Sequence, residues 1–154
     1  MTTLLDATLE VRCGQYRREF QMPAAIDPAS RHILLHIGQE YGAVTMPAAL
    51  GEQVQQQLTA AQLAAPVVHH PRAERWTFIT GPASEALTAH VSAELFRLYA
   101  TVACTGTQVV LPSFEDERTG HRVWVQQPEN ATALPPITAV IEAALGSRRK
   151  PHYN

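Results

Sequence analysis

Residues 66–82, PVVHHPRAERWTFITGP, are the stretch that decides the fold of this chain. Two short runs, 67–70 and 75–80, are rich in β-branched and aromatic residues, and a proline lies at each end of the stretch. The residues between them, 71–73, have the composition of a turn. The stretch therefore predicts two short strands joined by a tight connection.

The segments on either side of this hairpin give the fold class. Apolar residues at three- and four-residue spacing predict helices, and short apolar runs predict strands. The helices are expected over 47–64, over 84–103 and from Pro135 to a stop at Gly146, and the strands over 33–37, 42–46, 108–111 and 121–126. From 42 to 111 the order is β-α-β-β-α-β, which is typical of an antiparallel sheet with both helices on one face. We expect an α+β fold with a ferredoxin- or RRM-like βαββαβ core, an extra strand and a C-terminal helix.

The domain organisation follows from the length of 154 residues, which fits one domain with a substantial core. We expect an N-terminal helical segment and connector over 1–30, a single α+β domain over 31–146 and a flexible tail over 147–154. The helical pattern over 3–20 offers an apolar face that could dock on the domain or on a second subunit. Residues 113–120 are expected to form a charged loop.

The composition is that of an ordinary globular protein, with 45% hydrophobic and 17% charged residues and a net charge of −2. So small a charge provides no global field to attract nucleic acid or an anionic membrane, and any such partner has to meet a local patch. No export signal or membrane span is expected, which places the protein in the cytoplasm. Cys13 and Cys104 lack the spacing of a disulfide framework or a zinc site and are expected to be buried thiols.

The segment 106–124, GTQVVLPSFEDERTGHRVW, resembles the end of the bifunctional primase–polymerase (prim-pol) domain of the archaeo-eukaryotic primase superfamily. In that family a G-x-x-V-x-x-P-S strand is followed by a loop, a glycine and a strand that ends in an aromatic residue. The matching residues are Gly106, Val109, Pro112, Ser113, Gly120, Arg122 and Trp124. The resemblance covers about 40–146, includes the Leu-Pro-Pro at 134–136, and is closest to small actinobacterial members of the family.

The chain departs from that family where the family's catalytic groups stand. Active members place an aspartate pair on the first catalytic strand, a histidine on the second element and an acid on the third, and these groups hold divalent metal and the nucleoside triphosphate. Here the first strand reads GAVTM over 42–46, the histidine position falls on Trp76, and no acid lies around 100–103. Without carboxylates a magnesium ion has no hard ligands. We therefore expect no catalytic residues, no bound metal, no cofactor, and no primase or polymerase activity.

The candidate binding residues lie around the hairpin turn and the last predicted strand. Arginines suit phosphate, and tryptophans beside them can stack a base. The candidate nucleic-acid or anion site comprises His70, Arg72, Arg75, Trp76, Arg118, Arg122 and Trp124. Two alternatives oppose this interpretation: Trp76 alternates with Arg75 along its strand as a core residue does, and the carboxylates over 115–117 can pair with Arg118 and Arg122.

The leading functional hypothesis is a non-catalytic prim-pol-like module that binds single-stranded nucleic acid or a nucleotide in DNA transactions or transcription-related regulation. An alternative is a homodimeric or partner-binding regulatory protein without nucleic-acid binding. A further alternative is a metal- or nucleotide-dependent enzyme. A metal site would gather His69 or His70 with His121 and with His90 or Cys104, but no ligand spacing in the sequence supports it.

Overall fold

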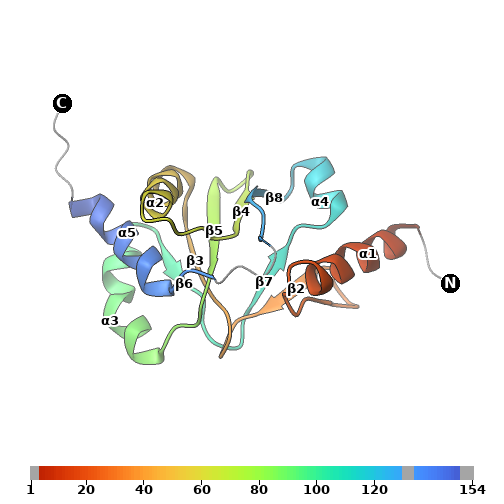
Figure 1. Cartoon of the computed structure of the whole chain (residues 1–154), viewed down its shortest axis with the longest axis horizontal. Coiled ribbons are helices and arrows are strands. Elements are labelled where there is room, and N and C mark those ends of the chain that lie inside the picture. The colour runs from red at the N-terminus through yellow and green to blue at the C-terminus, as the bar shows by residue number, and fades with distance from the viewer. Residues whose placement is uncertain (1–3, 130–133, 150–154) are drawn as a thin grey trace.

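The computed structural model describes residues 4–129 and 134–149 (Figure 1). They form five helices and two antiparallel sheets, so the predicted α+β class is confirmed. The elements in chain order are α1 (Leu4–Arg18), β1 (Ala25–Ile26), β2 (Ile33–His36), β3 (Gly42–Pro47), α2 (Ala48–Ala60), β4 (Val67–His70), β5 (Arg75–Thr80), α3 (Glu85–Phe96), β6 (Thr101–Val102), β7 (Gln108–Leu111), α4 (Phe114–Thr119), β8 (Val123–Gln126) and α5 (Ile137–Arg149).

The larger sheet has five strands in the order β6-β3-β5-β4-β8, and every neighbouring pair is antiparallel. Its first four strands and the helices α2 and α3 follow one another as β3-α2-β4-β5-α3-β6, which is the βαββαβ order of a ferredoxin-like core. Strand β8 joins the edge of β4. The two hairpin strands predicted from 66–82 have the bounds expected of them.

The last strand of the βαββαβ unit differs from the prediction. It is the two-residue β6, whereas the predicted strand, β7, belongs to a second sheet of order β1-β2-β7. Helix α3 also ends at Phe96 and is followed by a turn over 97–99, although the sequence predicted a helix as far as 103. An alternating apolar pattern indicates a strand with one buried face. It does not indicate to which of the two sheets that strand belongs.

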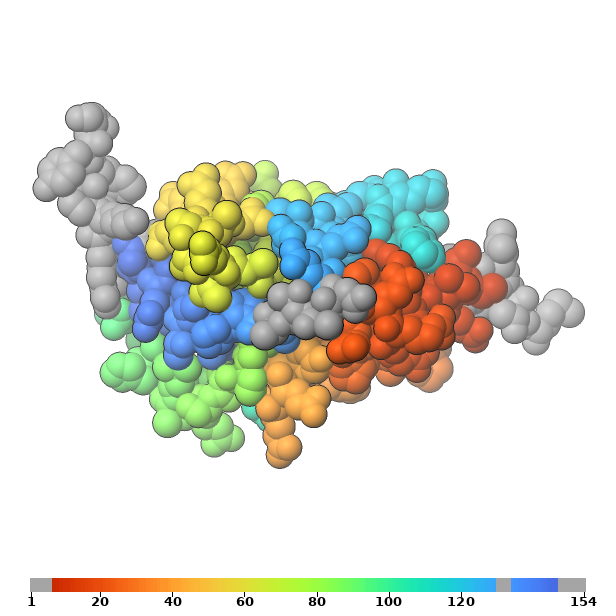
Figure 2. Space-filling view, in the orientation of Figure 1, coloured from red at the N-terminus to blue at the C-terminus, as the bar shows by residue number. Residues whose placement is uncertain are grey.

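Two hydrophobic cores lie on opposite faces of the larger sheet. Helices α2, α3 and α5 cover one face (Figure 1). Side chains such as Val44, Phe78 and Val140 are fully buried there. The second core lies between the other face, the smaller sheet and α1, and it includes Tyr16 and Leu111. Figure 2 shows the result as an elongated molecule with α1 at one end and α2, α3 and α5 at the other.

The N-terminal helix α1 docks on its own chain, which was one of the two possibilities left open by the sequence. Its residues Leu9, Cys13 and Tyr16 are buried in the second core with residues of β2 and β7. The other predicted thiol, Cys104, is exposed, so the expectation that both cysteines are buried was wrong for it. Cys104 follows β6 in a connection rather than ending a helix, which explains its exposure.

Two further segments differ from the prediction. The expected loop over 113–120 contains α4, because Ser113 and Asp116 form a capping box and Gly120 closes the helix in the left-handed conformation at φ 75°. Helix α5 continues past Gly146 to Arg149, and residues 150–154 of the expected tail lie outside the described residues. Among the residues that the structure describes, no helix combines the length and apolarity needed to cross a membrane.

Candidate anion-binding site

One end of the larger sheet carries polar side chains on the face opposite α2 and α5. Residues alternate across a strand, so Trp76 and Phe78 of β5 face the helices while Arg75, Thr77 and Ile79 face the other way. The second core covers the Ile79 end of that face. The Arg75 end lies at the β4–β5 turn, on the same side of the molecule as α4 (Figure 1).

A hydrogen-bonded row crosses three strands at this end. The hydroxyls of Thr45 in β3 and Thr77 in β5 are 2.9 Å apart, and Nε2 of His70 in β4 lies 3.1 Å from the Thr77 hydroxyl. Thr77 is buried and His70 is half-buried. His69 points to the helix-covered face, where its ring meets Trp76 edge-on at 6.2 Å, so the two adjacent histidines serve different surfaces.

Positive side chains surround His70. Arg75 is its cross-strand partner, and Arg122 approaches from the segment before β8. Burial lowers the pKa of His70 first, and the charge of Arg122 lowers it further, followed by His69, Arg75 and His121. We call His70, Arg75, His121 and Arg122, together with Arg72 on the β4–β5 turn, the cation patch.

Two members of the cation patch are held by hydrogen bonds. Nη2 of Arg75 donates to the carbonyl of Tyr99 at 2.8 Å and to that of Thr45 at 3.4 Å. Arg122 pairs with Asp116 of α4 at 3.2 Å, and both side chains are mostly buried, at 14% and 18% exposed. Asp116 therefore offsets part of the charge of Arg122, while the carbonyls fix Arg75 without neutralising it. A fixed guanidinium beside a half-buried histidine suits an anion such as phosphate.

Trp76, Trp124 and Arg118, three of the sequence-predicted site residues, are not part of this patch. The Trp76 side chain is only 7% exposed and packs over Gly51 of α2, so its ring offers no face to a base. Arg118 is exposed and forms a two-point ion pair with Glu115 on α4, as the sequence alternative anticipated. Of the remaining four, Arg75 and Arg122 interact electrostatically with His70, and Arg72 is counted with these three for its place on the β4–β5 turn.

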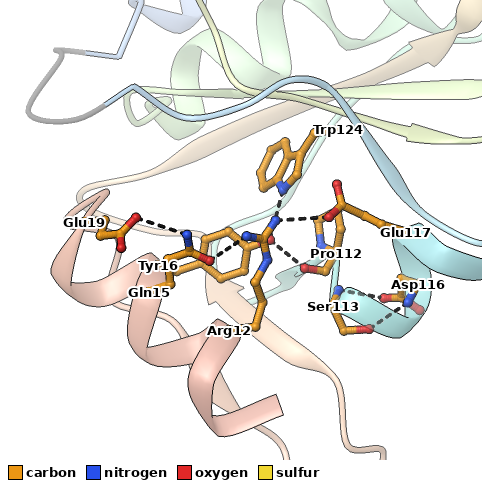
Figure 3. Close-up of polar contacts among 9 residues, drawn as sticks. All are labelled: Arg12, Gln15, Tyr16, Glu19, Pro112, Ser113, Asp116, Glu117 and Trp124. Atoms are coloured by element: carbon orange, nitrogen blue, oxygen red, sulfur yellow. Dashed lines mark hydrogen bonds and ion pairs between the residues drawn. The ribbon is translucent and has the colours of Figure 1, made fainter. Parts of the chain in front are cut away.

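Trp124 belongs to a network that attaches α1 to the domain (Figure 3). Its Nε1 donates to the Tyr16 hydroxyl at 2.9 Å, and that hydroxyl donates to the Pro112 carbonyl at 2.5 Å. The two rings meet edge-on at 5.9 Å. Burial raises the pKa of Tyr16 to about 12, so the hydroxyl stays protonated and able to donate at neutral pH.

Arg12, which the sequence reasoning did not single out, completes this network. It is 5% exposed, donates to Gln15 at 2.6 Å and to Glu117 at 3.2 Å, and lies 4.8 Å above the Tyr16 ring and 4.9 Å from the centre of the Phe114 ring. The signal available in the sequence was its position on the apolar face of the predicted helix, four residues before Tyr16. A buried arginine needs such partners, so its role here is to attach α1 to α4.

Four of the residues on which the predicted prim-pol resemblance rests have structural roles in this chain. Pro112 accepts the Tyr16 hydrogen bond, Ser113 caps α4, Gly120 ends α4, and Trp124 packs on Tyr16. Arg122, another residue of that resemblance, belongs to the cation patch. The four structural residues thus account for how α4 and β8 are built and attached.

The cation patch lies apart from the two larger cavities of the described structure. Two cavities of about 280 and 340 Å³ lie elsewhere in the described structure, one beside Phe20 and Gln126 and the other beside Ser92 and Cys104, and neither contains a residue of the patch. Within residues 4–129 and 134–149, no group of three or more histidine, cysteine or carboxylate side chains lies close enough together to hold a metal ion.

In comparisons with known proteins, no family model matches the chain, and no curated protein or solved structure matches it either.

Proposed function

We propose that this protein is a non-catalytic, prim-pol-like module that binds nucleic acid or a nucleotide through its phosphates, in DNA transactions or transcription-related regulation. The observation that carries the proposal is that Arg75 and Arg122 both lie near His70, at the β4–β5 turn end of the sheet face opposite the helices. Arginine and histidine side chains at a sheet surface are suited to the backbone of a single strand.

The chemistry of the sheet surface supports binding without catalysis. The residues of β3 that face the cation patch side are Ala43, Thr45 and Pro47, and none of them is a carboxylate. Thr45 and Thr77 hydrogen-bond to each other, and neutral hydroxyls do not replace the carboxylates that anchor magnesium in phosphoryl transfer. A divalent ion would therefore have no anionic ligand on β3.

The position of the patch outside the two larger cavities favours a polymer over a small enclosed ligand. Small-molecule sites usually bury most of their ligand in a cleft, and the two cavities described above contain none of the patch residues. A strand that follows arginine side chains along a sheet needs no such enclosure.

The proposal is tested by fluorescence anisotropy with a labelled single-stranded oligonucleotide at several salt concentrations. Binding through phosphates should weaken with salt, with a slope of log K against log salt of about −0.7 for each phosphate contact. Replacing the exposed Arg72 with alanine should remove about one such contact. The matched control is Arg17→Ala, which removes an exposed arginine from α1.

Two results would contradict the proposal. One is the absence of any salt-sensitive binding by the wild-type protein. The other is an equal loss of affinity in Arg72→Ala and Arg17→Ala, because this would show that any exposed positive charge serves as well as the patch.

A further inference from the structure

The two most exposed aromatic side chains of the described structure lie at the C-terminal end of α3, and the backbone of one of them, Tyr99, is hydrogen-bonded to Arg75 of the cation patch. Phe96 and Tyr99 are 73% and 75% exposed and close the C-terminal end of α3. Phe114, the next most exposed aromatic side chain, already has a partner in Arg12. Within the described residues, neither the Phe96 ring nor the Tyr99 ring stacks on another aromatic ring or on a cation.

The backbone of Tyr99 is fixed against the patch. The turn after α3 is closed by hydrogen bonds from the amides of Leu98 and Ala100 to the Leu95 carbonyl, and Tyr99 between them adopts the left-handed conformation at φ 58°. Its carbonyl accepts the 2.8 Å hydrogen bond from Arg75. Arg75 thus links the turn that carries the exposed ring to the strand that carries the positive charge.

The order of elements places Tyr99 at one end of the row that the patch forms. In the larger sheet β6 lies beside β3, which lies beside β5 and then β4. Tyr99 precedes β6, and Arg75 and His70 are register partners on β5 and β4. A strand of nucleic acid whose phosphates follow His70 and Arg75 would bring a base to the edge where Tyr99 lies.

We propose that Tyr99, assisted by Phe96, is the base-stacking platform of the cation patch, so that the ligand is a single strand with unpaired bases. This inference rests on the proposed function. It replaces the two tryptophans suggested by the sequence, because Trp76 is buried and Trp124 packs on Tyr16. Charge complementarity selects this occupant: Arg75 is bonded to the backbone carbonyl of Tyr99, and a nucleotide joins an anionic phosphate to an aromatic base.

The test compares Tyr99→Gly with the wild type on two probes: a labelled short oligothymidylate, and inorganic polyphosphate, which has the charge without the bases, used as a competitor. Glycine suits the left-handed backbone, so this variant should fold at least as stably as the wild type. Loss of one stacked base should weaken oligothymidylate binding about 5- to 150-fold. The affinity for polyphosphate should stay the same, and Tyr99→Phe should restore oligothymidylate binding.

The outcomes separate this inference from the proposed function. If the wild type binds both probes and Tyr99→Gly binds oligothymidylate equally well, the stacking role is wrong while the phosphate-binding proposal stands. If the wild type binds neither probe, the proposed function fails and the inference fails with it. If sedimentation shows a dimer that Tyr99→Gly converts to a monomer, the exposed rings cover a second copy of the chain, and the stacking role is overturned.

Discussion

Replacing Tyr16 with phenylalanine, which removes only its hydroxyl, should destabilise the protein more than the same substitution at any other described tyrosine. In Tyr16→Phe the ring still fills its place in the second core, where the wild-type residue is fully buried. The variant loses the hydrogen bond to the Pro112 carbonyl and the one from Trp124 Nε1. The Pro112 carbonyl and the Trp124 Nε1–H would then each lose a hydrogen-bond partner.

The magnitude follows from those two bonds. Leaving a buried polar group unpaired costs about 1–3 kcal/mol. The bond to Pro112 is buried and takes this full range, whereas the bond from Trp124 is part-buried and adds about 1 kcal/mol, so we expect the free energy of unfolding to fall by about 2–4 kcal/mol. In a domain of this size, that corresponds to a decrease in Tm of roughly 4–16 °C. The measurement is urea denaturation followed by tryptophan fluorescence, supported by a thermal scan.

Tyr41→Phe is the matched control. The Tyr41 hydroxyl donates to the Gln21 carbonyl in an exposed hydrogen bond of 3.3 Å, so its loss should cost less than about 0.5 kcal/mol. If Tyr16→Phe and Tyr41→Phe are equally stable, the network in Figure 3 does not hold α1 on the domain, and the argument is refuted.

The same residue predicts an alkaline effect with a defined sign. Burial raises the pKa of Tyr16 from 10.0 to about 12, so between these values the unfolded chain releases the phenolic proton while the folded chain keeps it. Stability that is fully present below pH 10 should therefore fall as the pH rises toward 12, by about 1.4 kcal/mol per pH unit. Tyr16→Phe lacks this contribution, so the stability gap between wild type and variant should narrow over that range. A gap that stays constant would contradict the assigned burial of the hydroxyl.

Three further substitutions test the packing. Gly51→Ala should cost about 1–3 kcal/mol, because the new Cβ would lie 2.7 Å from the Trp76 ring; stability equal to wild type in urea denaturation would contradict this packing. Gly146→Ala, in α5, meets nothing nearer than 3.9 Å and should instead stabilise the protein by about 0.5–1 kcal/mol, and a loss of stability would show that the site is tighter than described. Ser113→Ala removes the hydroxyl that accepts from the Asp116 amide at 2.9 Å and should cost about 1 kcal/mol, which Ser113→Thr should recover; equal stability of the alanine and threonine variants would exclude the cap.

The parts of the fold that could be predicted are those whose signal is local. The hairpin over 66–82 has its strand residues, its turn and its flanking prolines within one short stretch, and the structure confirms both strand bounds. Ser84 was likewise predictable as a helix cap, and its hydroxyl accepts from the Leu87 amide at 3.0 Å. In both cases the determining contacts join residues close in sequence.

The parts that were missed depend on partners distant in sequence or on weak local signals. Strand β6 has only two residues and follows a turn that uses Tyr99 where glycine is the usual choice, so no helix stop was visible. Helix α4 did have a signal in Ser113, Asp116 and Gly120, but its run of carboxylates was interpreted as a loop. Sequence spacing could not reveal the Tyr16–Trp124 contact, because the two residues are 108 positions apart.

The candidate site divides in the same way. His70 and Arg75 were predictable as neighbours because a tight hairpin places them opposite each other. Arg122 lies near them because β8 pairs with β4, and no local sequence pattern predicts that pairing. From the sequence, Trp76 could be either a base platform or a core residue. In the structure its ring packs so closely on α2 that a Cβ at Gly51 would lie 2.7 Å from it.

These structural roles affect how the predicted prim-pol resemblance is interpreted. Pro112, Ser113, Gly120 and Trp124 are each explained by a cap, a turn or a buried contact, so a chain needs them in order to build α4 and β8 and to attach α1, whatever the sheet binds. Residues of this kind determine the scaffold. The chemistry depends on the side chains that project from the sheet. In this chain those positions hold threonines hydrogen-bonded to each other, a histidine and arginines. Such groups can attract and orient an anion, which is the chemistry that the proposed binding function requires.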